Sequence, residues 1–246
     1  YDVIVAGGGI AGTMAAVAAA REGCRTLLIE RYNSLGGMGT LGLVQPITVW
    51  GFEDGYVVGG TGKRVLEDLA GGSSQAATPM SPYGPVCDAE YLKYRLETLV
   101  QDNGVELLYH SWVTDVIQEG DRITDVKFIS KAGEQTVKAK VFIDATGDAV
   151  LAAAAGVPCE TDSQGISLMF IVAGIDRDTC PDKQAIKKVW DQHKTWYRGL
   201  TLFWHPRPDA VYISATEVDG LDGRNPGDLT HATLECRRQA WLILDI

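Results

Sequence analysis

Three glycines near the N-terminus constrain this chain of 246 residues more than any other feature. Gly7, Gly9 and Gly12 form the pattern G-x-G-x-x-G between the β-branched run 2–6 and the Ala-rich stretch 10–22. The first glycine permits a tight turn, the second lets backbone approach a pyrophosphate, and the third lets the helix pack closely on the strand. A strand, this turn and a helix begin a right-handed βαβ unit. The sequence therefore predicts an α/β fold that binds a dinucleotide at the helix N-terminus.

A carboxylate follows the glycines at the spacing of such a unit. Residues 26–29 are typical of a second buried strand, and Glu30 stands at its end. A carboxylate in that place accepts hydrogen bonds from a ribose diol and repels a 2′-phosphate. The alternative, a glycine turn that binds nothing, does not require this acidic residue. The motif alone leaves the choice between NAD and FAD open.

The rest of the first half predicts elements that complete a sheet. In order, they are helices over 63–69 and 88–102, strands over 112–118, 123–130, 135–139 and 141–144, and a helix over 148–155. The first three of these strands are separated by short turns that contain glycine, which favours a small antiparallel meander. The fourth is apolar and short, as in a buried parallel strand.

The pattern changes after Pro158. Strands are expected over 167–173, 200–204 and 211–216, with a helix over 181–197 and a last helix that begins near Asp228 or Thr230. We therefore expect a first domain over residues 1–160 and part of a second, sheet-containing domain over residues 161–246.

Composition excludes several classes of partner. The chain has 22 Lys and Arg against 32 Asp and Glu, a net charge of −10, and no basic cluster. Nucleic acids and anionic membranes are therefore not expected as partners, because both bind clusters of Lys and Arg. No apolar run reaches the roughly 18 residues of a membrane helix. Five scattered cysteines without a C-x-x-C pair predict reduced thiols and a cytoplasmic protein, and the histidines have no metal-ligand spacing.

Two other features are weaker candidates for a site. Residues 59–64 contain the Gly-Lys pair of a phosphate loop, but valine stands at position 57 and Arg64 replaces Ser or Thr, so we expect a turn. His205, between Trp204 and Pro206, has the chemistry of an acid or base toward a substrate. A solitary histidine is more often structural, and nothing in the sequence pairs with it.

Two further segments favour FAD over NAD. Residues 35–40 (LGGMGT) follow Glu30 within a few positions, where an NAD enzyme usually continues into its next helix. Residues 145–148 (ATGD) follow a buried strand beyond the meander. With these segments the chain resembles the FAD-dependent oxidoreductase family with a glutathione-reductase-type FAD-binding fold, in the branch that carries ER…LGGxGT and IDATGD segments. The resemblance spans essentially the whole chain and is specific through about Gly156.

The resemblance implies a Rossmann-like FAD-binding domain with an inserted antiparallel meander, followed by the start of an α+β substrate domain. The implied contacts with FAD are Gly7, Gly9, Ala11 and Gly12 at the pyrophosphate, Glu30 at the ribose, Arg31 beside adenine, Gly37, Met38 and Thr40 along the ribityl path, Val113 through its backbone at adenine, and Ala145, Thr146 and Gly147 over the dinucleotide. The alternatives are a flexible glycine loop at 36–39 and an ordinary strand residue at 113.

The implied activity is hydride transfer between a small-molecule substrate and N5 of the flavin. The missing C-x-x-C pair excludes a dithiol relay, and no catalytic residue, electron acceptor or oligomeric state is assigned. FAD should be bound non-covalently, because His110-Ser111 lacks the following Gly pair of flavin-linking histidines. Two alternatives stay open: a non-redox flavin or NAD enzyme of cofactor biosynthesis, and an electron-transfer or binding module.

The ends of the sequence predict a longer protein. The chain begins inside its first strand, and it ends in the apolar run 240–244 with no capping glycine. We therefore expect these residues to be the N-terminal part of a longer chain.

Overall fold

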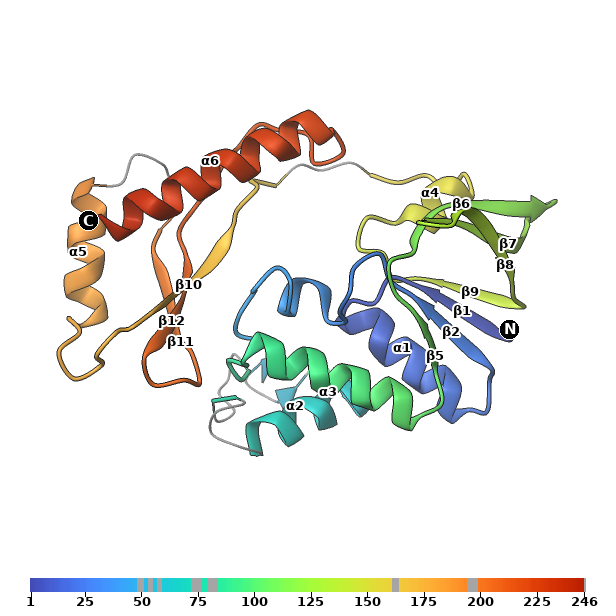
Figure 1. The fold of residues 1–246 in the computed structure, drawn as a ribbon, viewed down its shortest axis with the longest axis horizontal. Helices are drawn as coiled ribbons and strands as arrows, with labels where there is room; N and C mark the ends of the chain where they lie inside the picture. The colour runs from blue at the N-terminus through green and yellow to red at the C-terminus, as the bar shows by residue number, and fades with distance from the viewer. Residues whose placement is uncertain are drawn as a thin grey trace. The chain divides into compact units, whose positions relative to one another are not determined.

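A computed structural model describes residues 1–47, 51–52, 55–56, 59–71, 77–78, 84–160, 164–193 and 199–245 (Figure 1). These residues form two compact units. The first unit comprises Tyr1–Leu41, Val49–Leu69 and Ala89–Glu160, and the second comprises Gly42–Thr48, Ala70–Asp88 and Thr161–Ile246. Each unit has its own sheet and is described by itself.

The first unit is built on a four-stranded parallel sheet of order β5-β2-β1-β9. The strands are β1 (Val3–Ala6), β2 (Thr26–Ile29), β5 (Glu106–Leu108) and β9 (Val141–Asp144). Every residue of β1 and β2 is buried, which explains why both read as short β-branched or aliphatic runs without alternation. The predicted α/β class is confirmed.

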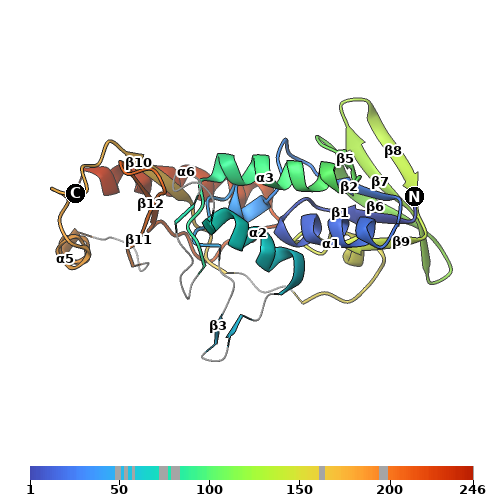
Figure 2. The ribbon, with the colours of Figure 1, turned by 90° about the horizontal axis from the view of Figure 1, so that it is seen from below.

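Helices cover one face of this sheet. The helix α1 (Ile10–Arg21) packs on β1 and β2, and α3 (Ala89–Asp102) packs on α1 and β5 (Figures 1 and 2). The buried stripe of α3 is Leu92, Leu96 and Val100, as its helical spacing predicts.

The helix α2 (Gly60–Gly71) corrects one prediction. It includes the glycine-rich residues that we expected to form a separate turn. Lys63 N–H already donates to Gly59 O at 3.5 Å, and Arg21 on α1 donates to Thr61 Oγ1 at 3.0 Å. These contacts, with Leu66 buried, extend the helix through residues of low helix propensity.

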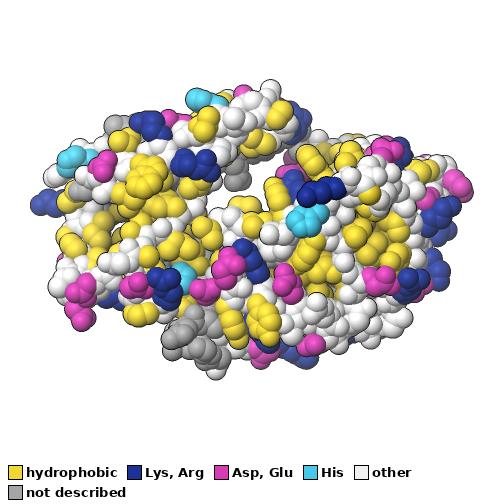
Figure 3. Space-filling view, viewed as in Figure 1, with side chains coloured by type: hydrophobic (Ala, Val, Ile, Leu, Met, Phe, Trp, Pro, Cys, Tyr) yellow, Lys and Arg dark blue, Asp and Glu magenta, His cyan; other side chains and the backbone are white. Residues whose placement is uncertain are grey.

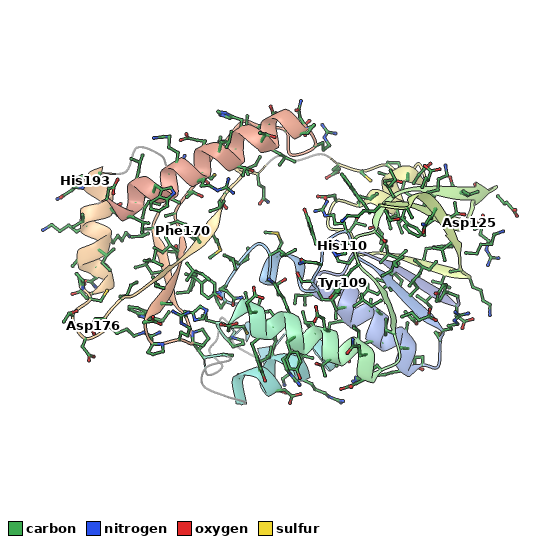
Figure 4. The ribbon with its side chains drawn as sticks, viewed as in Figure 1. Tyr109, His110, Asp125, Phe170, Asp176 and His193 are labelled. Carbon is green, nitrogen blue, oxygen red and sulfur yellow. The ribbon has the colours of Figure 1, made fainter. Side chains whose placement is uncertain are left out.

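The meander covers the other face of the sheet. Its antiparallel strands are β6 (Trp112–Glu119), β7 (Arg122–Ser130) and β8 (Gly133–Lys138), close to the predicted ranges. One apolar cluster joins the two layers, with Ile4 and Leu27 from the sheet against Val126 and Phe128 from the meander. Asp125, labelled in Figure 4, is a buried acid on β7.

Short elements complete the first unit. They are the 3-10 turn η1 (Gly37–Gly39), the hairpin strands β3 (Gly51–Phe52) and β4 (Gly55–Tyr56), and the helix α4 (Val150–Ala154). The helix α4 begins later than predicted because Ala149 has a left-handed φ of 54°. None of the described helices in either unit is long and apolar enough to cross a membrane.

The second unit contains an antiparallel sheet of order β10-β12-β11. The strands are β10 (Met169–Ala173), β11 (Thr201–Trp204) and β12 (Ala210–Ser214), accompanied by α5 (Lys183–His193) and α6 (Pro226–Leu244). The central strand β12 is buried throughout. The predicted helix over 181–197 ends at His193, and its last four predicted positions lie outside the described residues.

The start of α6 corrects the predicted start at Asp228 or Thr230. Asn225 is the N-cap, because its side-chain oxygen accepts hydrogen bonds from the N–H groups of Gly227 and Asp228 at 2.7 and 3.3 Å. Pro226 then occupies the first helical position. Proline is favourable there, because the N–H of that position has no partner within a helix and the fixed φ of proline is helical. Asn-Pro is therefore the start signal that the sequence analysis overlooked.

Candidate functional site

A cleft lies at the carboxyl edge of the parallel sheet in the first unit. The residues that line it follow β1, β2 and β9 or begin the meander: Gly7, Ile29, Glu30, Arg31, Ser111, Trp112, Val113, Thr146, Asp148 and Val150. Open α/β sheets bind their ligands at this edge, where successive connections diverge. Five of the predicted cofactor residues are thus brought together by one local arrangement.

The three motif glycines have different surroundings. Gly7 has a φ of 97°, and a Cβ there would collide with Ala145 O. A Cβ on Gly12 would collide with Gly7 O. A Cβ on Gly9 would meet nothing within 4 Å. The first and third glycines are therefore required by the packing of the protein itself, whereas Gly9 faces open space in which a ligand has room.

The N-terminus of α1 has no side-chain cap. Gly9 is its N-cap and provides no side-chain hydrogen bond, and the first turn contains no acidic residue. The first N–H groups of a helix have no partner within the helix and carry its positive dipole end. Ala11, in this first turn, is exposed. This end of α1 therefore fits a phosphate group, which would accept those hydrogen bonds.

Glu30 is buried and fixed by the backbone on two sides. Its Oε2 accepts a hydrogen bond from Gly8 N–H at 2.7 Å, and its Oε1 accepts one from Tyr32 N–H at 2.8 Å. A carboxylate has about four acceptor positions, so two such bonds leave capacity for hydroxyl groups. Glu30 therefore also holds the glycine turn in place, which the sequence analysis did not foresee.

The LGGMGT segment packs against the glycine turn. Gly36 N–H donates to Gly8 O at 2.8 Å, and a Cβ on Gly37 would lie 3.2 Å from Gly9 Cα. Gly36 and Gly37 both have left-handed φ values, 99° and 49°, so the segment needs glycine there. The flexible-loop alternative does not describe a segment held in this way.

Two predicted contact residues in this segment have contrasting positions. Met38 is 67% exposed, so its side chain is available to a ligand. Thr40 is buried, and its hydroxyl donates to Leu35 O at 2.7 Å. The Thr40 side chain therefore shapes the loop, and only its backbone is left for the predicted contact.

The ATGD segment is held by the acid that precedes it. Asp144 accepts hydrogen bonds from Thr146 Oγ1 at 2.7 Å and Thr146 N–H at 3.1 Å, and its other oxygen accepts Ala152 N–H at 3.0 Å. Burial alone would raise the pKa of Asp144, but these hydrogen bonds hold it below its ordinary value. Thr146 Oγ1 in turn accepts Val150 N–H at 2.9 Å. The sequence analysis missed Asp144, although an acid directly before Ala-Thr-Gly was the available signal.

The remaining predicted residues border the cleft in different ways. Val113 places its side chain in the core between sheet and meander, so only its backbone faces the cleft. Arg31 is exposed, with its guanidinium 4.8 Å from the ring centre of Tyr32. Gly147 has a φ of 81° and completes the turn after Thr146.

The second unit contains an apolar cavity of about 670 Å³. It lies between the sheet, α5 and the end of α6, where hydrophobic side chains gather in Figure 3. Val172, Trp204 and Ile213 line it from the sheet, and Val189 and Trp190 line it from α5. Its volume falls within the usual range for small-molecule sites.

His205 is a core residue of the second unit. Its Nδ1 accepts Arg207 N–H at 3.0 Å, its Nε2 lies 3.4 Å from Asp88 Oδ2, and its ring centre is 5.0 Å from that of Tyr212. Burial lowers the pKa of His205, although the nearby Asp88 carboxylate opposes this. It does not line the cavity, so the structural interpretation fits better than an acid–base role.

Known proteins resemble this chain in sequence. A family profile described as FAD dependent oxidoreductase matches residues 2–245. Digeranylgeranylglycerophospholipid reductase 2 of Methanococcoides burtonii is 29% identical over 162 residues, which cover 60% of this chain and 38% of the relative. Reductase 1 of the same organism is 26% identical, with 72% and 46% covered. The chain thus spans less than half the length of these relatives.

Solved structures show the same fold. A geranylgeranyl bacteriochlorophyll reductase-like protein of Thermoplasma acidophilum superimposes with a TM-score of 0.57 at 17% identity, over 94% of this chain and 60% of the other. At that identity the likeness concerns the fold alone.

Proposed function

Since the chain belongs to the family of FAD-dependent oxidoreductases, we propose that it catalyses hydride transfer between a small-molecule substrate and N5 of FAD. FAD is the cofactor of this family and supplies the redox chemistry when bound. The observation that carries the proposal is the uncapped N-terminus of α1, open at Gly9 and adjacent to the fixed carboxylate of Glu30. The parallel sheet with its inserted meander supports membership in the glutathione-reductase-type branch with the ER…LGGxGT and IDATGD segments.

The proposed contacts follow the cleft from phosphate to adenine. They are Gly7, Gly9, Ala11 and Gly12 at the pyrophosphate, Glu30 at the ribose, Arg31 and the Val113 backbone at adenine, Gly37, Met38 and the Thr40 backbone along the ribityl chain, and Ala145, Thr146 and Gly147 over the dinucleotide. In this arrangement backbone N–H groups neutralise the phosphates, so the net negative charge of the chain is no obstacle.

An absorption spectrum of the purified protein tests this proposal. We expect a flavin spectrum after incubation with FAD, and anaerobic addition of a substrate should bleach it. A flavin bleached by dithionite but by no substrate would favour an electron-transfer module. A substrate converted while the flavin stays oxidised throughout would favour a non-redox enzyme. Acid precipitation should release all colour into the supernatant, because we propose non-covalent binding.

We further propose that an apolar part of the substrate binds in the cavity of the second unit. Its lining is almost entirely apolar, and two curated relatives are named for the reduction of a digeranylgeranylglycerophospholipid. Ala185→Trp, on the cavity side of α5, should abolish substrate-dependent bleaching and leave FAD affinity unchanged. Gln184→Trp, on the same helix but outside the lining, is the control. Equal bleaching in both variants would contradict the assignment.

We propose a cytoplasmic location and no nucleic-acid partner. All five cysteines are free, as expected of a reducing compartment. The charge of −10 opposes binding to a phosphate backbone.

A further inference from the structure

Trp112 is a large aromatic residue exposed at the cleft. It is the first residue of β6, lines the cleft and is 56% exposed. Its neighbour Val113 is buried in the core, because successive strand residues point to opposite faces. Trp112 therefore presents its indole on the face away from the core, and the packing of the described residues does not bury it.

Two backbone hydrogen bonds hold the segment that carries Trp112. Ser111 N–H donates to Glu30 O at 3.0 Å, and His110 N–H donates to Tyr32 O at 3.1 Å. Figure 4 shows Tyr109 and His110 next to each other in the segment after β5. The segment that leads into β6 is thus paired with the residues that follow β2. This pairing places Trp112 beside the residue next to Glu30.

That residue is Arg31, and its side chain lies near the indole. The guanidinium of Arg31 is 6.0 Å from the ring centre of Trp112. Both a guanidinium and an indole can stack on a flat heterocycle. Both stand at the cleft that holds the Glu30 carboxylate. A purine attached to a ribose at Glu30 would extend toward them.

We infer that Trp112 stacks on the adenine of FAD, with Arg31 beside it, and so makes the site select FAD over FMN. The inference rests on the proposed FAD site. FMN has no adenosine, so it gains nothing from Trp112. Stacking on aromatic side chains recognises any base by its π-face, which explains how adenine is held where Val113 offers only backbone.

The test compares FAD and FMN binding in three variants of the apoprotein, followed by flavin fluorescence. Trp112→Ala should weaken FAD binding about tenfold or more, from the usual contribution of base–aromatic stacking, and leave FMN binding unchanged. Trp112→Phe keeps an aromatic face and should retain most of the affinity. Trp241→Ala removes another exposed tryptophan, 68% exposed on α6, and should change neither. Addition of FAD should quench part of the tryptophan fluorescence of the parent. This part comes from Trp112, so the variants that lack Trp112 should not show its quenching.

The outcomes separate the two proposals. If the parent binds FAD and Trp112→Ala binds it equally well, the stacking inference is wrong and the FAD site stands. If Trp112→Ala weakens FAD and FMN equally, Trp112 has a structural role only, and the inference is again wrong. If the parent itself binds no FAD, the proposed function fails. Should Trp112→Ala not fold, as judged by circular dichroism, the FAD-to-FMN affinity ratio of Trp112→Leu decides in its place.

Discussion

At the scale of single residues, Glu30 combines two roles that are usually described separately. It fixes the glycine turn through Gly8 N–H, and it offers the remaining acceptor positions to a ribose. Glu30→Ala should therefore weaken FAD binding about 10- to 100-fold, the range for a lost charge-assisted hydrogen bond. Titration of apoprotein by flavin fluorescence measures this. Arg25→Ala, which removes an exposed ion pair with Glu106, is the control and should bind FAD as the parent does.

Glu30→Gln is the conservative variant, because it replaces only one of the two oxygens that accept backbone hydrogen bonds. It retains one acceptor oxygen and the shape of the side chain, so its affinity should lie between those of the parent and Glu30→Ala. An affinity of Glu30→Ala equal to that of the parent would show that the ribose is bound elsewhere.

The motif glycines give a second prediction at this scale. Because Gly9 faces open space, Gly9→Val should leave the thermal unfolding of the apoprotein nearly unchanged while it abolishes FAD binding. Gly12→Val should instead destabilise the apoprotein, because its Cβ collides with Gly7 O. Differential scanning calorimetry without FAD distinguishes the two. Equal destabilisation by both would mean that Gly9 is required by packing and not by a ligand.

At the scale of elements, the helices α1 and α6 begin in opposite ways. The N-terminus of α6 is capped by Asn225, whereas that of α1 has no side-chain cap. Asn225→Ala should lower the free energy of unfolding by about 1 kcal/mol, the usual cost of a lost N-cap. Asn225→Ser keeps an acceptor and should restore most of it. FAD affinity should be the same in all three proteins.

The uncapped end of α1 has the complementary consequence. A ligand that binds only the folded state raises stability with its concentration. FAD should therefore raise the unfolding temperature of the parent and of Asn225→Ala by similar amounts. A much smaller shift in Asn225→Ala would mean that the cap of α6 also supports the cofactor site.

At the scale of the whole molecule, His205 makes stability depend on pH. Burial lowers the pKa of His205 in the folded state, so the unfolded chain binds more protons between that value and the ordinary value of about 6.5. The free energy of unfolding should therefore fall as pH drops below about 6.5. His205→Gln should flatten this part of the profile in urea titrations. An identical slope in the variant would contradict the assignment.

At lower pH, carboxylates determine how the free energy of unfolding depends on pH. Hydrogen bonds hold the pKa of Asp144 below its ordinary value despite burial, and Arg238 lowers the pKa of Glu235 to about 2. These carboxylates stabilise the fold at pH values above about 4, the ordinary pKa of Asp and Glu in an unfolded chain. Their contribution to the free energy of unfolding is lost as the pH falls further. The effect of His205 on the free energy of unfolding is therefore measured above pH 5, where these carboxylates stay ionised in the folded and the unfolded state.

The sequence by itself determined the parts of this protein that depend on local signals. The βαβ unit, the meander and the stripe of α3 follow from glycine positions, turn spacing and apolar periodicity, which act within a few residues. The family could be predicted from the sequence for the same reason. Each of the GxGxxG, LGGMGT and IDATGD segments is contiguous in the chain.

Only the tertiary structure decided how distant segments meet. It joined Gly8 to the carboxylate of Glu30, paired Ser111 with Glu30, and placed Trp112 beside Arg31. It also grouped residues 42–48 and 70–88 with the second unit. Such contacts depend on pairing between segments far apart in the chain, and no local pattern carries that information. The hydrogen bonds that shape the candidate site are of this kind, which is why the sequence identified its glycines and its carboxylate but not its tryptophan.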